Sequence, residues 1–322
     1  MDGDQGFKHP VGVIGLGIMG TAMGVRLLNA GFTVCGFDID EEQNTAFARL
    51  GGSITSSAKE VADRCPIMIT SLTSAKALAA ALEAMDRPQG TGRLGTVIIE
   101  ASTLSVNEKL DAKRHARSFG ADLLDCPISG TGQQTLAGDA VAYLSGGEPR
   151  NREHARIVLT GVCRAVLDLG PFGNGTRMKL IANHLVAVHN AAAAEALVLA
   201  KHAGVDLDSA LAALTSGAGS SRMLEVRGPL MVAGEFDKPT MRVGTFDKDL
   251  TLIGAFAAEV GAPTPLFTAT AGLYGLAKEQ GREGQDTACV FAVLDGLTID
   301  GLAKRTVGDQ RRTRSRRSRR AT

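Results

Sequence analysis

The segment Gly15-Leu-Gly17-Ile-Met-Gly20 constrains the fold of this chain more than any other feature. It directly follows the apolar run Val11–Ile14 and opens a stretch with helical periodicity. In such a strand–turn–helix unit the first glycine permits a tight turn, the second lets the backbone approach a pyrophosphate, and the third lets helix and strand pack closely. The helix start adds free N–H groups and a positive dipole end. We therefore predict that a dinucleotide is bound by Gly15, Gly17, Ile18, Met19 and Gly20.

An acidic residue, Asp38, closes the next apolar run and lies 18 residues after Gly20. A carboxylate at this place accepts hydrogen bonds from the ribose hydroxyls and repels a 2′-phosphate. Three more acids, Asp40, Glu41 and Glu42, follow it, and no arginine occurs before Arg49. Asp38 therefore favours NAD over NADP as the cofactor.

Short apolar runs alternate with helical stretches through the first half of the chain. They are rich in Val and Ile and cover residues 11–15, 33–38, 67–72, 96–100, 122–126, 140–145 and 165–169. This alternation predicts an α/β domain of Rossmann type, in which helices cover both faces of a mostly parallel, doubly wound sheet.

The second half of the chain has the pattern of helices alone. Residues 174–204 form one Ala- and Leu-rich stretch, long enough for a helix of about 40 Å. Further helical stretches cover residues 207–215, 246–260, 264–280 and 287–302. We predict a dinucleotide-binding domain over residues 8–172 and an all-α domain over 173–304 that begins with a long interdomain helix. A basic, disordered tail is predicted over 305–322.

Charge is distributed unevenly along the chain. The net charge is only +1, yet the last 20 residues carry nine Lys or Arg and one acid, so the remainder is acidic. Such a body does not attract nucleic acid, and we expect polyanion binding only as a non-specific property of the tail. The five cysteines lie far apart, and no apolar run approaches the roughly 20 residues that span a bilayer. We expect a cytoplasmic protein with reduced thiols, no metal and no membrane segment.

Two further motifs occur in the chain. They are Asp125-Cys-Pro-Ile-Ser129-Gly-Thr-Gly132 and Gly173-Asn-Gly-Thr-Arg-Met-Lys179-Leu-Ile-Ala-Asn183. Together with the glycine loop, and in this order and spacing, they resemble the β-hydroxyacid dehydrogenase family from about residue 11 to residue 301. The resemblance implies a Rossmann-type domain, a long interdomain helix and an all-α domain that also forms the subunit contact. It therefore implies a homodimer or homotetramer.

The resemblance also assigns roles to residues of the last two motifs. Ser129, Gly130 and Thr131 would bind the substrate carboxylate, and such a turn offers successive N–H donors and hydroxyls to an anion. Lys179 would be the general acid/base and Asn183 its partner in binding substrate. Lys179, Asn183 and Asn190 share one face of the predicted helix, which is a polar stripe among Ala, Leu and Val.

Three more positions match the family's pattern. Lys248, in Phe-Asp-Lys-Asp-Leu, would reach toward cofactor and substrate, and Ser102 with Thr103 would lie beside the nicotinamide ribose. His184 and His189 are interpreted as packing or surface residues, because Lys179 already fills the acid/base role.

The chain departs from the family's pattern in two loops. Residues 71–73 read Ser-Leu-Thr where many relatives have Met-Leu-Pro, so cofactor contacts from that loop are in question. Gln133 and Gln134 replace smaller residues after the substrate loop, which suggests a substrate with an extra hydroxyl or polar group.

The sequence therefore predicts an NAD-dependent oxidoreductase that interconverts a small β-hydroxy acid and its semialdehyde. One alternative is an oxidative decarboxylase of the phosphogluconate type, in which Arg222 could bind a substrate phosphate. Another is a non-catalytic dehydrogenase-like module that binds polyanions through the basic tail. The lysine at position 179 argues against that module and against an imine reductase.

Overall fold

The computed structural model describes residues 9–86 and 95–297. The chain divides into two compact units, one of Met1–Asn183 with Thr251–Gly261 and one of His184–Leu250 with Ala262–Thr322. The division falls inside two helices, α8 (Asn174–His202) and α11 (Val243–Glu259). The predicted tail over residues 305–322 lies outside the described residues, and the predicted domain limits stay predictions.

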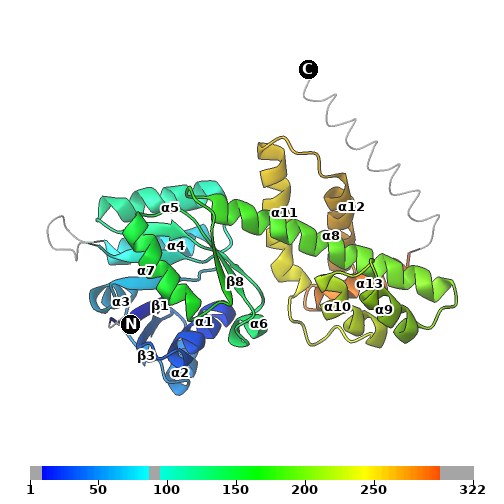
Figure 1. Ribbon diagram of the computed structural model, residues 1–322, viewed down its shortest axis with the longest axis horizontal. Coiled ribbons are helices and arrows are strands. Elements are labelled where there is room, and N and C mark those ends of the chain that lie inside the picture. Colours follow the sequence, from blue (N-terminus) through cyan, green and yellow to red (C-terminus); the bar gives the residue numbers. More distant parts are fainter. Residues whose placement is uncertain (1–8, 87–94, 298–322) are drawn as a thin grey trace, which may run out of the picture. The chain divides into compact units, whose positions relative to one another are not determined.

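The first unit is built on a six-stranded parallel sheet with the strand order β3-β2-β1-β4-β5-β6 (Figure 1). Its strands are β1 (Val11–Ile14), β2 (Val34–Phe37), β3 (Ser53–Ile54), β4 (Ile67–Thr70), β5 (Val97–Glu100) and β6 (Asp122–Asp125). The register places Val11 opposite both Val34 and Ile67. This order is that of the Rossmann dinucleotide-binding fold, so the predicted fold class is confirmed.

Side chains of the central strands alternate between two hydrophobic cores, one on each face of the sheet. Ile69 and Ile99 belong to one core, whereas Met68 and Ile98 belong to the other. The first core is covered by α1 (Ile18–Asn29), α2 (Glu41–Arg49) and α7 (Pro149–Thr160). The second core is covered by α3 (Ala58–Arg64), α4 (Ala75–Met85) and α5 (Val106–Ser118). Burial on both faces explains why these strands are continuous apolar runs in the sequence.

Three further strands form a separate small sheet in the same unit. They are β7 (Ile128–Ser129), β8 (Val141–Leu144) and β9 (Ala165–Asp168), and β7 runs antiparallel to β8. Two of the predicted apolar runs therefore belong to this sheet and not to the main one. Pro127 has no N–H and stops the β6 ladder, and its carbonyl accepts the N–H of Tyr143 on β8. A short helix, α6 (Gly132–Leu136), follows β7.

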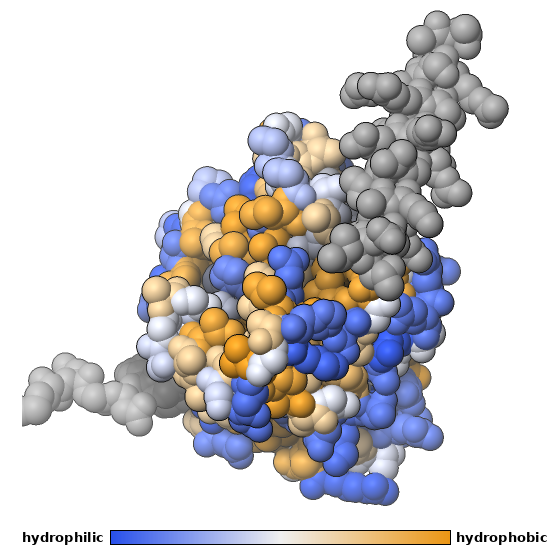
Figure 2. All heavy atoms as spheres, turned by 90° about the vertical axis from the view of Figure 1, so that its right-hand side faces the viewer, coloured by the Kyte–Doolittle hydropathy of each residue, from blue (hydrophilic) through white to orange (hydrophobic). Residues whose placement is uncertain are grey.

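The second unit is helical among its described residues, as the sequence predicts. Besides its parts of α8 and α11 it contains α9 (Leu207–Ser216), α10 (Arg222–Ala233), α12 (Pro265–Glu279), the 3₁₀ turn η1 (Thr287–Cys289) and α13 (Val290–Asp295). Phe246 and Tyr274 meet edge to face in its core, with ring centroids 5.5 Å apart. Figure 2 shows hydrophobic residues interspersed with hydrophilic ones on the face turned to the viewer.

The five cysteines are all buried, and none of them forms a disulfide. Burial raises the pKa of the Cys163 thiol to about 12 and that of Cys289 to about 11, so both stay protonated at neutral pH. Within residues 9–86 and 95–297, no helix combines the length and the apolar character needed to cross a membrane.

Candidate active site

The glycine loop after β1 has the shape that a pyrophosphate site needs. Gly15 has a φ of +89°, and a Cβ at position 20 would lie 1.8 Å from the Gly15 carbonyl oxygen, so both positions require glycine. At Gly17, by contrast, a Cβ would meet no atom within 4 Å. Gly17 is also the N-cap of α1 and has no side chain to bond the N–H groups of the first turn. The loop therefore offers room, N–H donors and a positive dipole end to the phosphates of a dinucleotide.

Asp38 follows β2 and is hydrogen-bonded to this loop. Its Oδ2 accepts the N–H of Leu16 at 2.6 Å, and its Oδ1 accepts the N–H of Asp40 at 2.9 Å. Buried Asn44 on α2 holds the Asp38 backbone: its Oδ1 accepts the Asp38 N–H at 2.8 Å, and its Nδ2 donates to the Asp38 carbonyl at 2.9 Å. The sequence analysis missed Asn44. A polar residue in the helix that follows the acid was the available signal.

Ser102 and Thr103 lie in the loop after β5. Ser102 is buried, its Oγ accepts the N–H of Leu72 at 2.8 Å, and its own N–H donates to Glu100 Oε1 at 2.8 Å. Ser102 therefore joins the loop after β4 to the loop after β5. Both loops lie at the carboxyl edge of the sheet, where dinucleotides bind in this fold. The nicotinamide-side role of Ser102 and of half-buried Thr103 stays a prediction.

The predicted substrate loop turns from β7 into α6. Ser129 ends β7, Gly130 has a φ of +149°, and Thr131 is the N-cap of α6. Gln134 completes a capping box: its Oε1 accepts the Thr131 N–H at 2.8 Å, and its own N–H donates to Thr131 Oγ1 at 3.2 Å. The Thr131 N–H is thus already bonded, which corrects the prediction of successive free N–H donors. Gln134 therefore holds the loop, whereas Gln133 is exposed.

The substrate loop and the glycine loop are neighbours in the structure. A Cβ at Gly132, the first residue of α6, would lie 2.5 Å from Cγ2 of Ile18, the first residue of α1. Figure 1 shows α6 beside α1. The structure therefore brings together two predicted groups of site residues that are more than 100 residues apart in the sequence.

Lys179 and Asn183 lie on the part of α8 that belongs to this same unit. Both are buried, with exposed fractions of 9% and 3%. The first turn of α8 lies close to the small sheet, because a Cβ at Gly175 would be 2.3 Å from the Tyr143 carbonyl oxygen. The N–H of Thr176 also donates to Asp125 Oδ2 at 2.8 Å. A lysine is rarely buried unless it is paired, and this one follows directly after a turn tied to the strand that leads to the substrate loop.

Comparisons with known proteins agree with this geometry. Residues 10–170 match a family model described as the NAD binding domain of 6-phosphogluconate dehydrogenase. Residues 173–294 match one described as NAD-binding of NADP-dependent 3-hydroxyisobutyrate dehydrogenase. The chain is 31% identical to the L-threonate dehydrogenase of Cupriavidus necator over 295 residues, which are 91% of this chain and 99% of that protein. The chain belongs to the β-hydroxyacid dehydrogenase family.

Solved structures place this β-hydroxyacid dehydrogenase among enzymes of the same fold. It is similar to a 3-hydroxyisobutyrate dehydrogenase from Salmonella typhimurium, with a TM-score of 0.78 and 27% identity over 89% of this chain and 100% of that one. A Mycobacterium tuberculosis 3-hydroxyisobutyrate dehydrogenase with L-serine also has a TM-score of 0.78 and 27% identity, over 89% and 99% of the two chains. These findings support the dehydrogenase prediction over the decarboxylase and the non-catalytic module.

Lys248 belongs to the helical unit of this β-hydroxyacid dehydrogenase and is exposed on α11. Its neighbour Asp247 forms an ion pair with Lys278, whose Nζ lies 2.6 Å from Asp247 Oδ2. The predicted role of Lys248 toward cofactor and substrate stays a prediction. Within the described parts of the chain, no three His, Cys, Asp or Glu side chains are grouped in a way that could hold a metal ion.

The predicted polar stripe of α8 divides between two environments. Lys179 and Asn183 belong to the first unit, whereas Asn190 lies in the core of the helical unit. There its Nδ2 donates to the hydroxyl of Tyr274 at 2.8 Å and to the carbonyl of Thr287 at 2.9 Å. Asn190 is therefore a packing residue. His184 stacks on Phe267 with ring centroids 5.4 Å apart, which confirms the packing interpretation for that histidine.

Proposed function

We propose that this β-hydroxyacid dehydrogenase interconverts a small β-hydroxy acid and its semialdehyde with NAD, and that Lys179 is its general acid/base. One observation carries the proposal. The unit that holds the glycine loop and Asp38 also holds a buried lysine and a buried asparagine, one turn apart on α8. The first turn of that helix is hydrogen-bonded to Asp125, four residues before the substrate loop begins at Ser129.

The residues of the chain divide the chemistry in a simple way. Ser129, the Gly130 backbone and the Thr131 hydroxyl hold the substrate carboxylate. Lys179 Nζ accepts the proton of the substrate hydroxyl during oxidation and returns it to the carbonyl oxygen during reduction. Asn183 hydrogen-bonds that same oxygen and orients it toward Lys179. The nicotinamide of the cofactor would supply the hydride acceptor or donor when the cofactor is bound.

The preference for NAD rests on Asp38 and the residues that follow it. The Asp38 carboxylate is bonded to the glycine loop and faces the place where this fold binds the adenosine ribose. A 2′-phosphate there would meet the charge of Asp38 with Asp40, Glu41 and Glu42 close behind in the sequence. A family model that matches the second half carries a description naming an NADP-dependent enzyme, so the cofactor test must include both nucleotides.

We propose a hydroxylated acid as the substrate, with L-threonate the first compound to test. The L-threonate dehydrogenase of Cupriavidus necator matches this chain over almost its whole length. In the structure, exposed Gln133 follows directly after the substrate loop, where its amide could bond a further hydroxyl.

A rate panel followed through NADH absorbance tests the function. L-threonate, 3-hydroxyisobutyrate, 3-hydroxypropionate, glycerate and L-serine are each offered with NAD and then with NADP. Lys179→Ala should lower kcat by about 10²- to 10⁴-fold, the usual contribution of general acid–base catalysis. Lys59→Ala is the control, because Lys59 lies in the same unit, is exposed and forms an ion pair with Asp63. Undiminished turnover in Lys179→Ala would remove Lys179 from its role.

We also propose that the protein is a cytoplasmic homodimer or homotetramer. Exposed leucines on the helical unit fit the subunit contact that the family resemblance implies, since Leu199 and Leu266 are 71% and 69% exposed. Light scattering of the eluting protein measures the assembly directly, and a monomer at micromolar concentration would contradict this proposal.

A further inference from the structure

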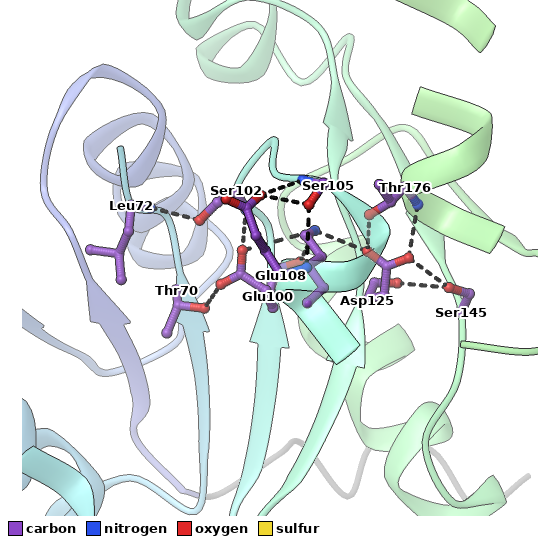
Figure 3. Close-up of polar contacts among 10 residues, drawn as sticks. Thr70, Leu72, Glu100, Ser102, Ser105, Glu108, Asp125, Ser145 and Thr176 are labelled. Atoms are coloured by element: carbon purple, nitrogen blue, oxygen red, sulfur yellow. Dashed lines mark hydrogen bonds and ion pairs between the residues drawn. The ribbon is translucent and has the colours of Figure 1, made fainter. Parts of the chain in front are cut away.

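Three charged side chains, Glu100, Lys109 and Asp125, are completely buried in the first unit. Figure 3 shows Glu100 and Asp125 with their polar contacts. Lys109 Nζ lies 2.9 Å from Asp125 Oδ1 and 3.8 Å from Glu100 Oε1, and it also donates to the Glu100 carbonyl oxygen at 3.3 Å. Glu100 ends β5 and Asp125 ends β6, so the cluster lies at the carboxyl edge of the sheet. Lys109 reaches both strands from α5.

Asp125 connects this ion cluster to the start of α8. Its Oδ1 accepts the Thr176 hydroxyl at 2.7 Å in addition to Lys109, and its Oδ2 accepts the Thr176 N–H at 2.8 Å and the Ser145 hydroxyl at 3.1 Å. The Ser145 Oγ in turn accepts the N–H of Gly175 at 2.9 Å. A helix cannot bond the N–H groups of its first turn internally, and here those of Gly175 and Thr176 are bonded by side chains at the ends of β6 and β8. Lys179 follows Thr176 by three residues, or about 4.5 Å along the helix.

Glu100 connects the ion cluster to the loops on the proposed nicotinamide side. Its Oε1 accepts the N–H of Ser102 at 2.8 Å, and its Oε2 accepts the hydroxyl of Thr70. The Ser102 Oγ accepts the N–H of Leu72. Lys109 therefore connects two groups of hydrogen bonds through its contacts with Glu100 and Asp125. One group holds the loops after β4 and β5, and the other holds the start of α8.

Stability alone does not account for such a cluster. Taking ionised groups out of water is costly, and replacing a buried ion pair by apolar groups of similar size is often neutral or stabilising. Two carboxylates also share a single ammonium here, which is a further cost. What the cluster does provide is a defined placement of the elements it joins, because a fully bonded buried polar network rigidifies the structure around it.

We propose that Lys109 and Asp125 are positioning residues, which with Glu100 lock the first turn of α8, and hence Lys179, onto the loop that holds Ser102. This inference rests on the role proposed above for Lys179. The ion pairs and hydrogen bonds of the cluster lead to the start of α8 and to the loop that holds Ser102, so the cluster acts on the chemistry through the placement of the helix.

The sharpest test removes the hydroxyl that joins α8 to the cluster. Thr176→Val keeps the shape of the side chain and deletes the hydrogen bond from the hydroxyl to Asp125, whereas Thr176→Ser keeps the hydroxyl. Thr55→Val is the matched control, because Thr55 is also buried in the first unit and its hydroxyl bonds the carbonyls of Gly36 and Ser57, away from the ion cluster. The paired variant Lys109→Met with Glu100→Gln removes one charge of each sign, so that no new net charge is buried.

We expect kcat to fall about tenfold in Thr176→Val and up to about a hundredfold in the paired variant. The KM values should change less than about threefold, because a small misplacement of a catalytic group acts mainly on the chemical step. Thr176→Ser should restore kcat to within twofold, and Thr55→Val should match the unmodified protein. Hydrogen exchange of the full chain without cofactor should show about tenfold faster exchange at Gly175 and Thr176 in the paired variant, with the sheet still protected.

Each outcome decides between the two proposals. If Lys179→Ala stays active, the proposed function of Lys179 fails, while the exchange data still judge the lock on α8. If Lys179→Ala is inactive but Thr176→Val and the paired variant keep both kcat and slow exchange, the positioning role is overturned. Loss of kcat in Thr55→Val as large as in Thr176→Val would show a general packing effect and would also overturn it.

Discussion

Replacing Asp38 by Asn should change the choice of nicotinamide cofactor more than any other single substitution in the chain. Two unit charges about 4 Å apart repel by roughly 1 kcal/mol in water and roughly 4 kcal/mol at an effective dielectric constant of 20. A phosphate monoester carries about −1.5 charges at neutral pH. Because Asp38 is half-buried, its carboxylate should disfavour a 2′-phosphate by about 3 kcal/mol, a factor of about 100 in affinity.

The substitution also removes hydrogen bonds within the protein. This loss weakens NADH and NADPH alike, so it cancels in the ratio of their dissociation constants. The carboxylate accepts the N–H groups of Leu16 and Asp40 on its two oxygens, and an asparagine has only one acceptor oxygen to offer. Both nucleotides should therefore bind somewhat more weakly, while the NADH-to-NADPH ratio of dissociation constants moves toward one. Titrations followed by nicotinamide fluorescence measure both constants without a substrate.

Asp40→Asn provides the control for the Asp38 experiment. Asp40 is exposed two residues further on, and its Oδ1 caps α2 by accepting the N–H of Glu42, a bond that asparagine can also accept. Solvent screens this charge, so the ratio should change less than about threefold. A ratio that stays constant in Asp38→Asn, or that shifts equally in Asp40→Asn, would refute the electrostatic reasoning.

Two other predictions concern the glycine loop and the acid stability of the helical unit. Gly20→Ala should lower both the melting temperature and the affinity for NADH, because its Cβ would lie 1.8 Å from a carbonyl oxygen. Gly17→Ala should lower the affinity alone, because its Cβ meets no protein atom within 4 Å. Equal melting temperatures in the two variants would contradict this prediction. Burial works to raise the pKa of Asp286, but the N–H of Ala288 and the Arg227 guanidinium outweigh it and hold that pKa below its usual value. The carboxylate therefore stabilises the fold above about pH 4 and loses this contribution as the pH falls through the lowered pKa. Asp286→Asn should lower the melting temperature at pH 7 and flatten its decline between pH 5 and 3, and a decline as steep as in the unmodified protein would contradict the assignment.

The elements that the sequence predicted share one property, which is a signal contained within a few adjacent residues. The strands β1, β4 and β5 are buried on both faces and therefore appear as apolar runs. The two-residue strands β3 and β7 are too short to show such a run and were missed. Helix α10 was missed because Gly228 and Pro229 interrupt its helical pattern, although tertiary packing tolerates them.

The predicted site likewise has features that are local in the sequence and partners that are distant in it. The spacing of the three glycines and the position of Asp38 could be read directly, because a tight turn and the end of the next strand are local features. The partners that hold the site could not, since Thr176 and its acceptor Asp125 are 51 residues apart. Lys109 looks like a surface lysine in a polar helix, and nothing adjacent to it indicates complete burial.

The sequence by itself therefore determined most of the strands and helices, the glycine loop and the residue types available for catalysis, because these depend on backbone turns and on hydrophobic periodicity. The tertiary structure decided which of those residues are bonded to one another. Parallel strands bring their carboxyl ends to a single edge, so Glu100 and Asp125 meet there around one lysine. Hydrogen bonds and ion pairs depend on distances in space, and only folding sets those distances.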